Sequence, residues 1–186
     1  MINILIVEGP DNSGKSTFIL HMLEKYQDIC KELKFPKKVS DGRFSLTTRS
    51  EVAIFEEMIK HLDPEKLYIV DRCYISNYVY EGLRGAKTDI YEDDWKRLTT
   101  MDNVNIIPLV ITRNHIECDF EDDLISLSSH GFNLVIDRYE DFAYRHGVYL
   151  TKFLQHNTKN YFLHHFDSLK ERAEKYIIDS LILNSN

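Results

Sequence analysis

The chain has 186 residues, long enough for one domain with a substantial core and too short for two ordinary domains. Its apolar and charged fractions are typical of a soluble globular protein, and a formal net charge of -7 argues against a large basic surface for duplex DNA or an anionic membrane. The three cysteines lie far apart without metal-ligand spacing, and the first residues hold no long apolar run. We therefore expect a single domain over residues 1–186, located in the cytoplasm, with no membrane partner and no favoured nucleic-acid partner.

Short apolar runs alternate with segments of helical spacing along the chain. In chain order, the pattern predicts a strand over Ile4–Val7, a helix over Ser16–Tyr26, an extended segment over Phe35–Val39, a helix over Val52–Leu62, a strand over Leu67–Val70, a helix after Asp71, a helix face of Tyr91, Trp95 and Leu98, strands over Ile106–Ile111 and Tyr161–Phe166, and a C-terminal helix starting at a Ser168–Glu171 capping box. This alternation predicts a three-layer α/β/α domain with a parallel sheet and ligands at the carboxyl ends of its strands.

The first strand leads directly into a phosphate-binding motif. The stretch "GPDNSGKS", residues 9–16, fits GxxxxGK[ST] at every defined position and stands between a strand and a helix, as its chemistry requires. Backbone N–H groups and the helix N-terminus can hold phosphate oxygens, Lys15 can reach the β- and γ-phosphates, and the hydroxyl of Ser16 can bind Mg²⁺. The residues predicted to bind ATP are Gly9, Asn12, Ser13, Gly14, Lys15, Ser16 and Thr17.

A second pair of residues follows the strand over Leu67–Val70. Asp71 stands where a phosphate-loop enzyme carries an acidic residue beside its metal, so Asp71 and Ser16 are the predicted Mg²⁺ ligands. Its neighbour Arg72 has a planar guanidinium that can engage two oxygens of a second phosphate. The pair therefore predicts an acceptor phosphate next to the triphosphate.

Three segments together resemble the thymidylate kinase family of nucleoside monophosphate kinases. They are "EGPDNSGKST", "VDRCYISNYVYEGLRG" and "DRYEDFAYRHGVYLTKF", and the resemblance runs in order from Met1 to about Tyr176. It implies a P-loop NTPase fold, with a five-stranded parallel sheet in the order 2-3-1-4-5 flanked by helices. It also implies ATP and Mg²⁺ as cofactors, a nucleotide as the small-molecule partner, and a homodimer packed through helices.

The resemblance assigns further roles to residues of this chain. Lys15, Asp71, Arg72 and Arg138 are the implied catalytic residues, and Asp11 faces the 3′-hydroxyl of the acceptor sugar. The acceptor site is completed by Lys38 in "KFPKKV", by Phe44 and Arg49 in "FSLTTRSE", and by Ser76 and Tyr80 on the helix after Asp71.

A lid-like segment is expected around residues 114–138, but it departs from the family pattern. Family members carry a catalytic arginine either in the phosphate loop or in the lid, whereas this loop offers Asn12 and the segment Asn114–Ile136 holds no arginine or lysine. Arg113 and Arg138 flank that segment, and Arg84 follows the second motif. Either Arg138 or Arg84 could approach the transferred phosphoryl group, and sequence alone does not choose between these two.

The nature of the nucleophile separates the candidate reactions. A monophosphate acceptor already carries an ionised oxygen and needs cations, whereas a hydroxyl acceptor needs a carboxylate base near the end of the second strand. That place reads Phe35-Pro36-Lys37-Lys38, which is basic, although Asp41 lies close by. The sequence therefore favours transfer to dTMP or a related pyrimidine deoxynucleotide. Two alternatives stay open: a kinase of a hydroxyl on a nucleoside or modified base, including one within DNA, and a non-catalytic nucleotide-binding protein.

Overall fold

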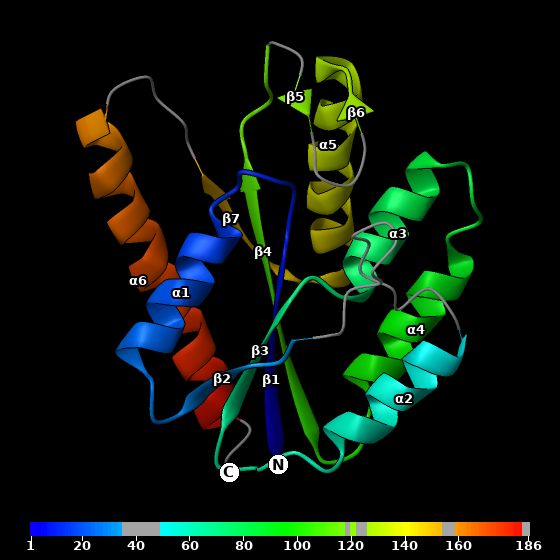
Figure 1. The fold of residues 1–186 in the computed structure, drawn as a ribbon, viewed down its shortest axis with the longest axis vertical. Helices are drawn as coiled ribbons and strands as arrows, with labels where there is room; N and C mark the ends of the chain where they lie inside the picture. The colour runs from blue at the N-terminus through cyan, green and yellow to red at the C-terminus, as the bar shows by residue number, and fades with distance from the viewer. Residues whose placement is uncertain (35–48, 118–119, 122–125, 154–158, 184–186) are drawn as a thin grey trace.

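The computed structural model describes residues 1–34, 49–117, 120–121, 126–153 and 159–183 (Figure 1). Within these ranges the elements are β1 (Ile2–Glu8), α1 (Lys15–Lys25), β2 (Cys30–Glu32), α2 (Arg49–Ile59), β3 (Leu67–Asp71), α3 (Tyr74–Leu83), α4 (Asp89–Thr99), β4 (Val104–Arg113), β5 (Phe120–Glu121), β6 (Ser126–Leu127), α5 (Ser129–His146), β7 (Tyr149–Phe153) and α6 (Lys159–Leu183). None of the helices in the described ranges is both long and apolar enough to cross a membrane.

Five strands form one parallel sheet in the order β2-β3-β1-β4-β7, and β5 and β6 form a separate antiparallel pair. Numbering the five parallel strands along the chain gives the predicted order 2-3-1-4-5. In the central pair Val7 lies opposite Asp71, and on the other side of β1 Glu8 lies opposite Val110. The phosphate loop therefore leaves the sheet between the ends of β3 and β4.

Helices cover both faces of the sheet, which gives the predicted three layers. Figure 1 shows α1 and α6 on one face and α2, α3, α4 and α5 on the other. Alternate residues of a strand point to opposite faces, and β1 accordingly sends Ile4 and Ile6 into the core under α2–α5, and Leu5 and Val7 into the core under α1 and α6. All four side chains are fully buried, so β1 is apolar on both faces as a central parallel strand must be.

The prediction of a last strand at Tyr161–Phe166 was wrong. Those residues lie in α6, and the fifth strand of the sheet is β7, which pairs in parallel with Leu109–Arg113 of β4. A short aromatic run does not distinguish a strand from a buried helix, and the four-residue spacing of the buried Leu169, Ala173 and Ile177 fits a helix.

Two further expectations change for related reasons. The proposed capping box fails because Ser168 and Glu171 lie inside α6 and not at its start. The second strand of the sheet is β2, where Cys30–Glu32 pairs with Leu67–Ile69. The extended segment predicted over Phe35–Val39 lies outside the described residues.

Candidate active site

The loop between β1 and α1 has the backbone that a phosphate site needs. Gly9 and Gly14 have φ values of 141° and 89°, and Asn12 also lies in the left-handed region at 52°. The Lys15 ammonium is buried against the loop and donates to the Pro10 carbonyl at 2.7 Å. The loop thus folds back over the Lys15 side chain, and Lys15 is also the first residue of α1.

Gly9 is required by a close approach as well as by its dihedral angle. A Cβ built at this position would collide with the backbone carbonyl of Ile111 on β4, which cannot move without disturbing the sheet. We expect Gly9→Ala to destabilise the fold by more than the roughly 1–3 kcal/mol of backbone strain alone. Urea unfolding of Gly9→Ala and Gly85→Ala provides the comparison, since Gly85 also has a positive φ but open space around its Cα. Equal losses in the two variants would refute the collision.

The structure brings together three residues predicted to serve the acceptor. The Arg72 guanidinium forms a salt bridge with the Asp11 carboxylate and donates to the Tyr80 hydroxyl at 3.1 Å, with its central carbon 5.5 Å from the centre of the Tyr80 ring. Arg72 has a φ of 64°, a conformation that is uncommon for a side chain of this size and is found mainly at functional sites. The strained backbone at Arg72 thus directs its guanidinium across the end of β3 toward Asp11.

A carboxylate from β1 holds the helix that follows Arg72. The N-cap of α3 is Cys73, whose side chain makes no capping bond. Glu8 supplies the acceptor instead, taking the Cys73 N–H at 2.6 Å and the Ser76 N–H at 3.3 Å as well as the Ser76 hydroxyl. The Ser76 proton is used in that bond, so the Tyr139 hydroxyl donates to Ser76 Oγ at 2.7 Å. This buried network fixes the start of α3, and with it Arg72, to the strand that carries the loop.

Glu8 gives the fold a specific pH dependence. Burial raises the pKa of Glu8 above its ordinary value of 4.5, against the smaller lowering by its hydrogen bonds with Ser76 and Cys73 and by the charge of Arg72. A raised folded-state pKa means that the unfolded chain loses this proton first, so stability is lost as the pH rises through the folded value. We expect the unfolding free energy of the wild type to fall relative to that of Glu8→Gln as the pH rises from 4.5 toward neutrality. A pH-independent difference in urea unfolding would contradict this expectation.

The residues present fit a bound triphosphate with its magnesium ion. The N-cap of α1 is Gly14, which has no side chain to occupy the helix N-terminus, and the first turn of α1 contains no acidic residue. The Ser13 hydroxyl is fully buried and has no hydrogen-bond partner among the described residues. Ser16 is exposed in the first turn of α1, and Asp71 ends the neighbouring strand; both offer the hard oxygen atoms that Mg²⁺ prefers.

The remaining predicted residues fall in three groups. Lys38 and Phe44 lie outside the described residues, and Arg49 begins α2 without a described side chain. Arg138 lies on α5 with its guanidinium packed against Gly82 of α3, where a Cβ would displace it. The roles assigned to these residues and to Ser76 stay predictions.

Two residues of the site received no role from the sequence. Glu8 is the capping acceptor of α3, and its only signal was a carboxylate at the end of an otherwise apolar strand. Arg113 ends β4, is buried, and donates to the Asn12 carbonyl of the phosphate loop at 3.4 Å. Its signal was a cation at the carboxyl end of a central strand.

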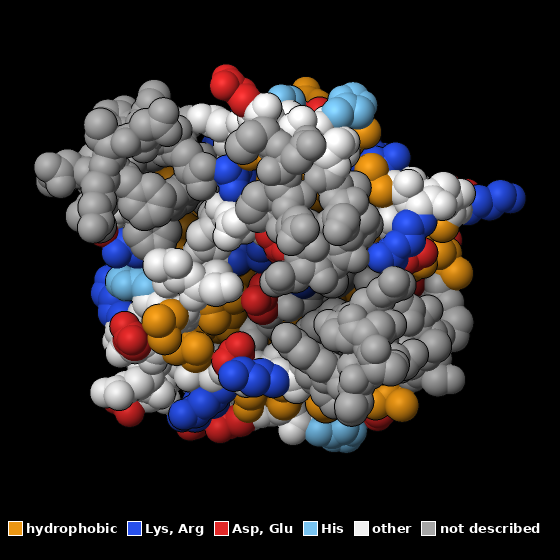
Figure 2. All heavy atoms as spheres, turned by 45° about the horizontal axis from the view of Figure 1, so that its top comes forward, with side chains coloured by type: hydrophobic (Ala, Val, Ile, Leu, Met, Phe, Trp, Pro, Cys, Tyr) orange, Lys and Arg blue, Asp and Glu red, His pale blue; other side chains and the backbone are white. Residues whose placement is uncertain are grey.

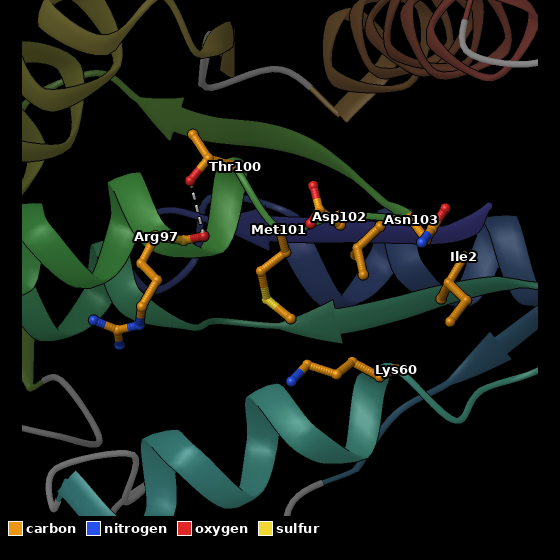
Figure 3. Close-up of a pocket in the computed structure, with 8 residues that line it drawn as sticks. Ile2, Lys60, Arg97, Thr100, Met101, Asp102 and Asn103 are labelled. Carbon is orange, nitrogen blue, oxygen red and sulfur yellow. Dashed lines mark hydrogen bonds between the residues drawn. The ribbon is translucent and has the colours of Figure 1, made fainter.

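A view onto the end of the molecule that holds the loop shows acidic and basic side chains next to one another near its centre (Figure 2). A separate cavity of about 510 Å³ lies at the opposite end of the sheet, where its strands begin (Figure 3). The residues that line it include Ile2 at the start of β1 and Val104 at the start of β4. Its two cations are paired within the chain, Lys60 with Glu57 and Arg97 with Glu56 and Asp94. Because it lies where β1 and β4 begin, and the phosphate loop follows the end of β1, this cavity is distinct from the phosphate site.

The sheet order and the loop define the fold of the P-loop nucleoside monophosphate kinases. In its fold, the chain is similar to solved thymidylate kinases. The enzyme from Ehrlichia chaffeensis has 17% identity and a TM-score of 0.52, with 84% of this chain and 89% of that chain covered. The enzyme from Candida albicans has 14% identity and a TM-score of 0.55, with 95% and 93% covered.

A third solved structure of the same fold is the YorR protein of Bacillus subtilis in complex with phosphorylated GDP. It has 12% identity and a TM-score of 0.50, with 98% of this chain and 96% of that chain covered. No protein-family model and no curated protein sequence matches the chain. At these identities the likenesses establish the fold, and the thymidylate-kinase resemblance of the three sequence segments is confirmed at that level.

Proposed function

We propose that the protein is an ATP-dependent nucleotide kinase that transfers the γ-phosphoryl group to dTMP or a related, including modified, pyrimidine deoxynucleoside monophosphate. The observation that carries this proposal is the cluster of Asp11, Arg72 and Tyr80 beside the phosphate loop. It joins a guanidinium suited to a phosphate with a carboxylate suited to a sugar hydroxyl, and both lie at the carboxyl edge of the sheet.

The residues of the chain divide the work of the proposed reaction. Bound Mg²⁺–ATP supplies the phosphoryl group, with Ser16 and Asp71 as ligands of the metal. Lys15 neutralises charge on the β- and γ-phosphates, and Arg72 holds the acceptor phosphate so that its ionised oxygen lies in line for attack. Asp11 accepts the hydrogen bond of the 3′-hydroxyl. No general base is needed, because the attacking oxygen carries no proton.

Other residues complete the proposed acceptor site. Lys38 contributes to the acceptor phosphate, Phe44, Arg49, Ser76 and Tyr80 line the base pocket, and residues 114–138, with Arg138, act as the lid. The exposed side chains of Ile54 and Met58 on α2 offer a face for the proposed homodimer, which light scattering of the purified protein will test. The cytoplasm is the proposed location.

One assay distinguishes this proposal from its alternatives. Purified protein is incubated with γ-labelled ATP and Mg²⁺ and, in separate reactions, dTMP, dUMP, the other nucleoside monophosphates, thymidine and single-stranded DNA. Transfer to dTMP or another pyrimidine deoxynucleotide supports the proposal. Transfer to thymidine or DNA with none to the monophosphates overturns it in favour of a hydroxyl kinase, and ATP binding without any transfer overturns it in favour of a non-catalytic binding protein.

A further inference from the structure

Phosphoryl transfer needs positive charge and oriented donors around the triphosphate, and the chain has few cations in the usual places. The loop contributes Lys15 alone, and residues 114–137 contain neither arginine nor lysine. Arg113, immediately before that segment, is a residue that the structure brings to the loop from elsewhere, at Asn12, as it brings Arg72 to Asp11. A role of Arg113 in nucleotide binding rests on the proposed nucleotide site.

The side chain of Arg113 is held on two sides. It is 6% exposed, its Nη1 donates to the Asn12 carbonyl at 3.4 Å, and its guanidinium carbon lies 5.7 Å from the centre of the Phe132 ring on α5. Donation from a charged group strengthens a bond of this length, and a guanidinium over an aromatic face is itself favourable. Arg113 therefore links the loop to α5.

The contact has a directional consequence for the loop. In a planar trans peptide the C=O and N–H groups point in opposite directions. When the Asn12 carbonyl turns toward Arg113, the Ser13 N–H of the same peptide must turn away from Arg113. Asn12 reaches this orientation with a φ of 52°, a left-handed conformation that a non-glycine residue adopts at a cost unless its surroundings hold it.

We propose that Arg113 is a positioning residue of the phosphate loop: by holding the Asn12 carbonyl it directs the Ser13 N–H toward the bound phosphates. The buried guanidinium also places a positive charge next to the loop, in addition to those of Lys15 and Arg72. The chain thereby obtains from the end of β4 an arginine, which the loop and residues 114–137 lack.

Affinity for inorganic tripolyphosphate and for ATP, measured by titration calorimetry, tests the proposal. Tripolyphosphate has no base or sugar, so it reports on the loop. We expect Arg113→Gln to weaken both ligands by a similar factor of about ten or more, since hydrogen bonds from charged groups are of that strength. Arg113→Lys should recover part of the loss, because the ammonium keeps the charge but is not a planar fork. The matched control is Arg172→Gln on α6, an exposed arginine whose Nε donates to the Ser168 carbonyl, also at 3.4 Å.

A second measurement separates positioning from general loss of structure. In ¹H–¹⁵N spectra the Ser13 amide of the wild type should shift strongly on addition of tripolyphosphate, and in Arg113→Gln this shift should shrink while the spectrum elsewhere stays folded. If Arg113→Gln loses the fold, Arg113→Lys takes its place in both measurements.

The outcomes for Arg113 and for the proposed function are distinguishable. The role of Arg113 alone is overturned if Arg113→Gln binds the ligands within twofold of the wild-type affinity, or if the shift of the Ser13 amide is unchanged. If the Gln variant does not fold, the same criteria apply to the folded Arg113→Lys. If the wild type transfers no phosphoryl group but Arg113→Gln still weakens ligand binding, the role of Arg113 is supported and the proposed kinase activity is overturned. Wild-type protein that binds neither ligand overturns both.

Discussion

Replacement of Lys15 by methionine is expected to slow phosphoryl transfer about 100- to 1000-fold, the effect of removing one preorganised donor from a developing charge. The Lys15 side chain is buried in the loop and its Nζ lies 2.7 Å from the Pro10 carbonyl, so it is already in place before nucleotide binds. Methionine keeps most of the length and the apolar stem of lysine and removes the ammonium group with its charge and donors. Initial rates at saturating ATP and acceptor measure the loss.

The control for this substitution is a lysine outside the site. Lys60, just after the end of α2, is exposed and paired with Glu57, so Lys60→Met should leave the rate unchanged. A Lys15→Met variant as active as the wild type would remove the phosphate loop from the mechanism. If Lys15→Met loses both ATP binding and the fold, the rate is measured instead on Lys15→Arg, which keeps the positive charge but not the shape of the lysine side chain.

Arg72→Gln is expected to lower kcat/KM for the acceptor about 10- to 150-fold, with a smaller change in the KM for ATP. The lost interaction is a charge-assisted bond to the acceptor phosphate, and a neutral glutamine does not restore its charge. Arg72→Lys should recover only part of the loss, because an ammonium does not bind two phosphate oxygens in the planar geometry of a guanidinium. An equal rise in the KM of both substrates would show that Arg72 does not belong to the acceptor alone.

The same residue also contributes to stability through Asp11. The two side chains are only 13% and 18% exposed, so removal of the guanidinium leaves a largely desolvated carboxylate without this partner. We expect Arg72→Gln to reduce the free energy of unfolding by about 1.5–3 kcal/mol. The double variant with Asp11→Asn should lose less than the sum of the two single variants, as residues in direct contact do not act independently. Additive losses in urea unfolding would contradict the pair.

Local patterns in the sequence determined much of this protein. Apolar runs such as Leu67–Val70 determined the three central strands β1, β3 and β4, because a central parallel strand must be apolar on both faces. The spacing of two glycines, a lysine and a serine between a strand and a helix determined the phosphate loop, because that chemistry is completed within eight consecutive residues. The sequence also placed Asp71 and Arg72 correctly at the end of a strand, because they directly follow the apolar run Leu67–Val70.

The tertiary structure decided what depends on contacts distant in sequence. Asp11 meets Arg72 across 61 residues, Glu8 caps α3 across 65, and Arg113 reaches Asn12 across 101, and no local pattern records such meetings. The identity of the last strand was decided in the same way. The aromatic run at Tyr161–Phe166 has strand propensity, but pairing along the edge of β4 chose Tyr149–Phe153, since strand formation is settled by a partner strand and not by the segment itself. The sequence by itself thus determined the phosphate loop and the class of fold, and the approach of β3 and β4 on either side of β1 decided which side chains surround that loop.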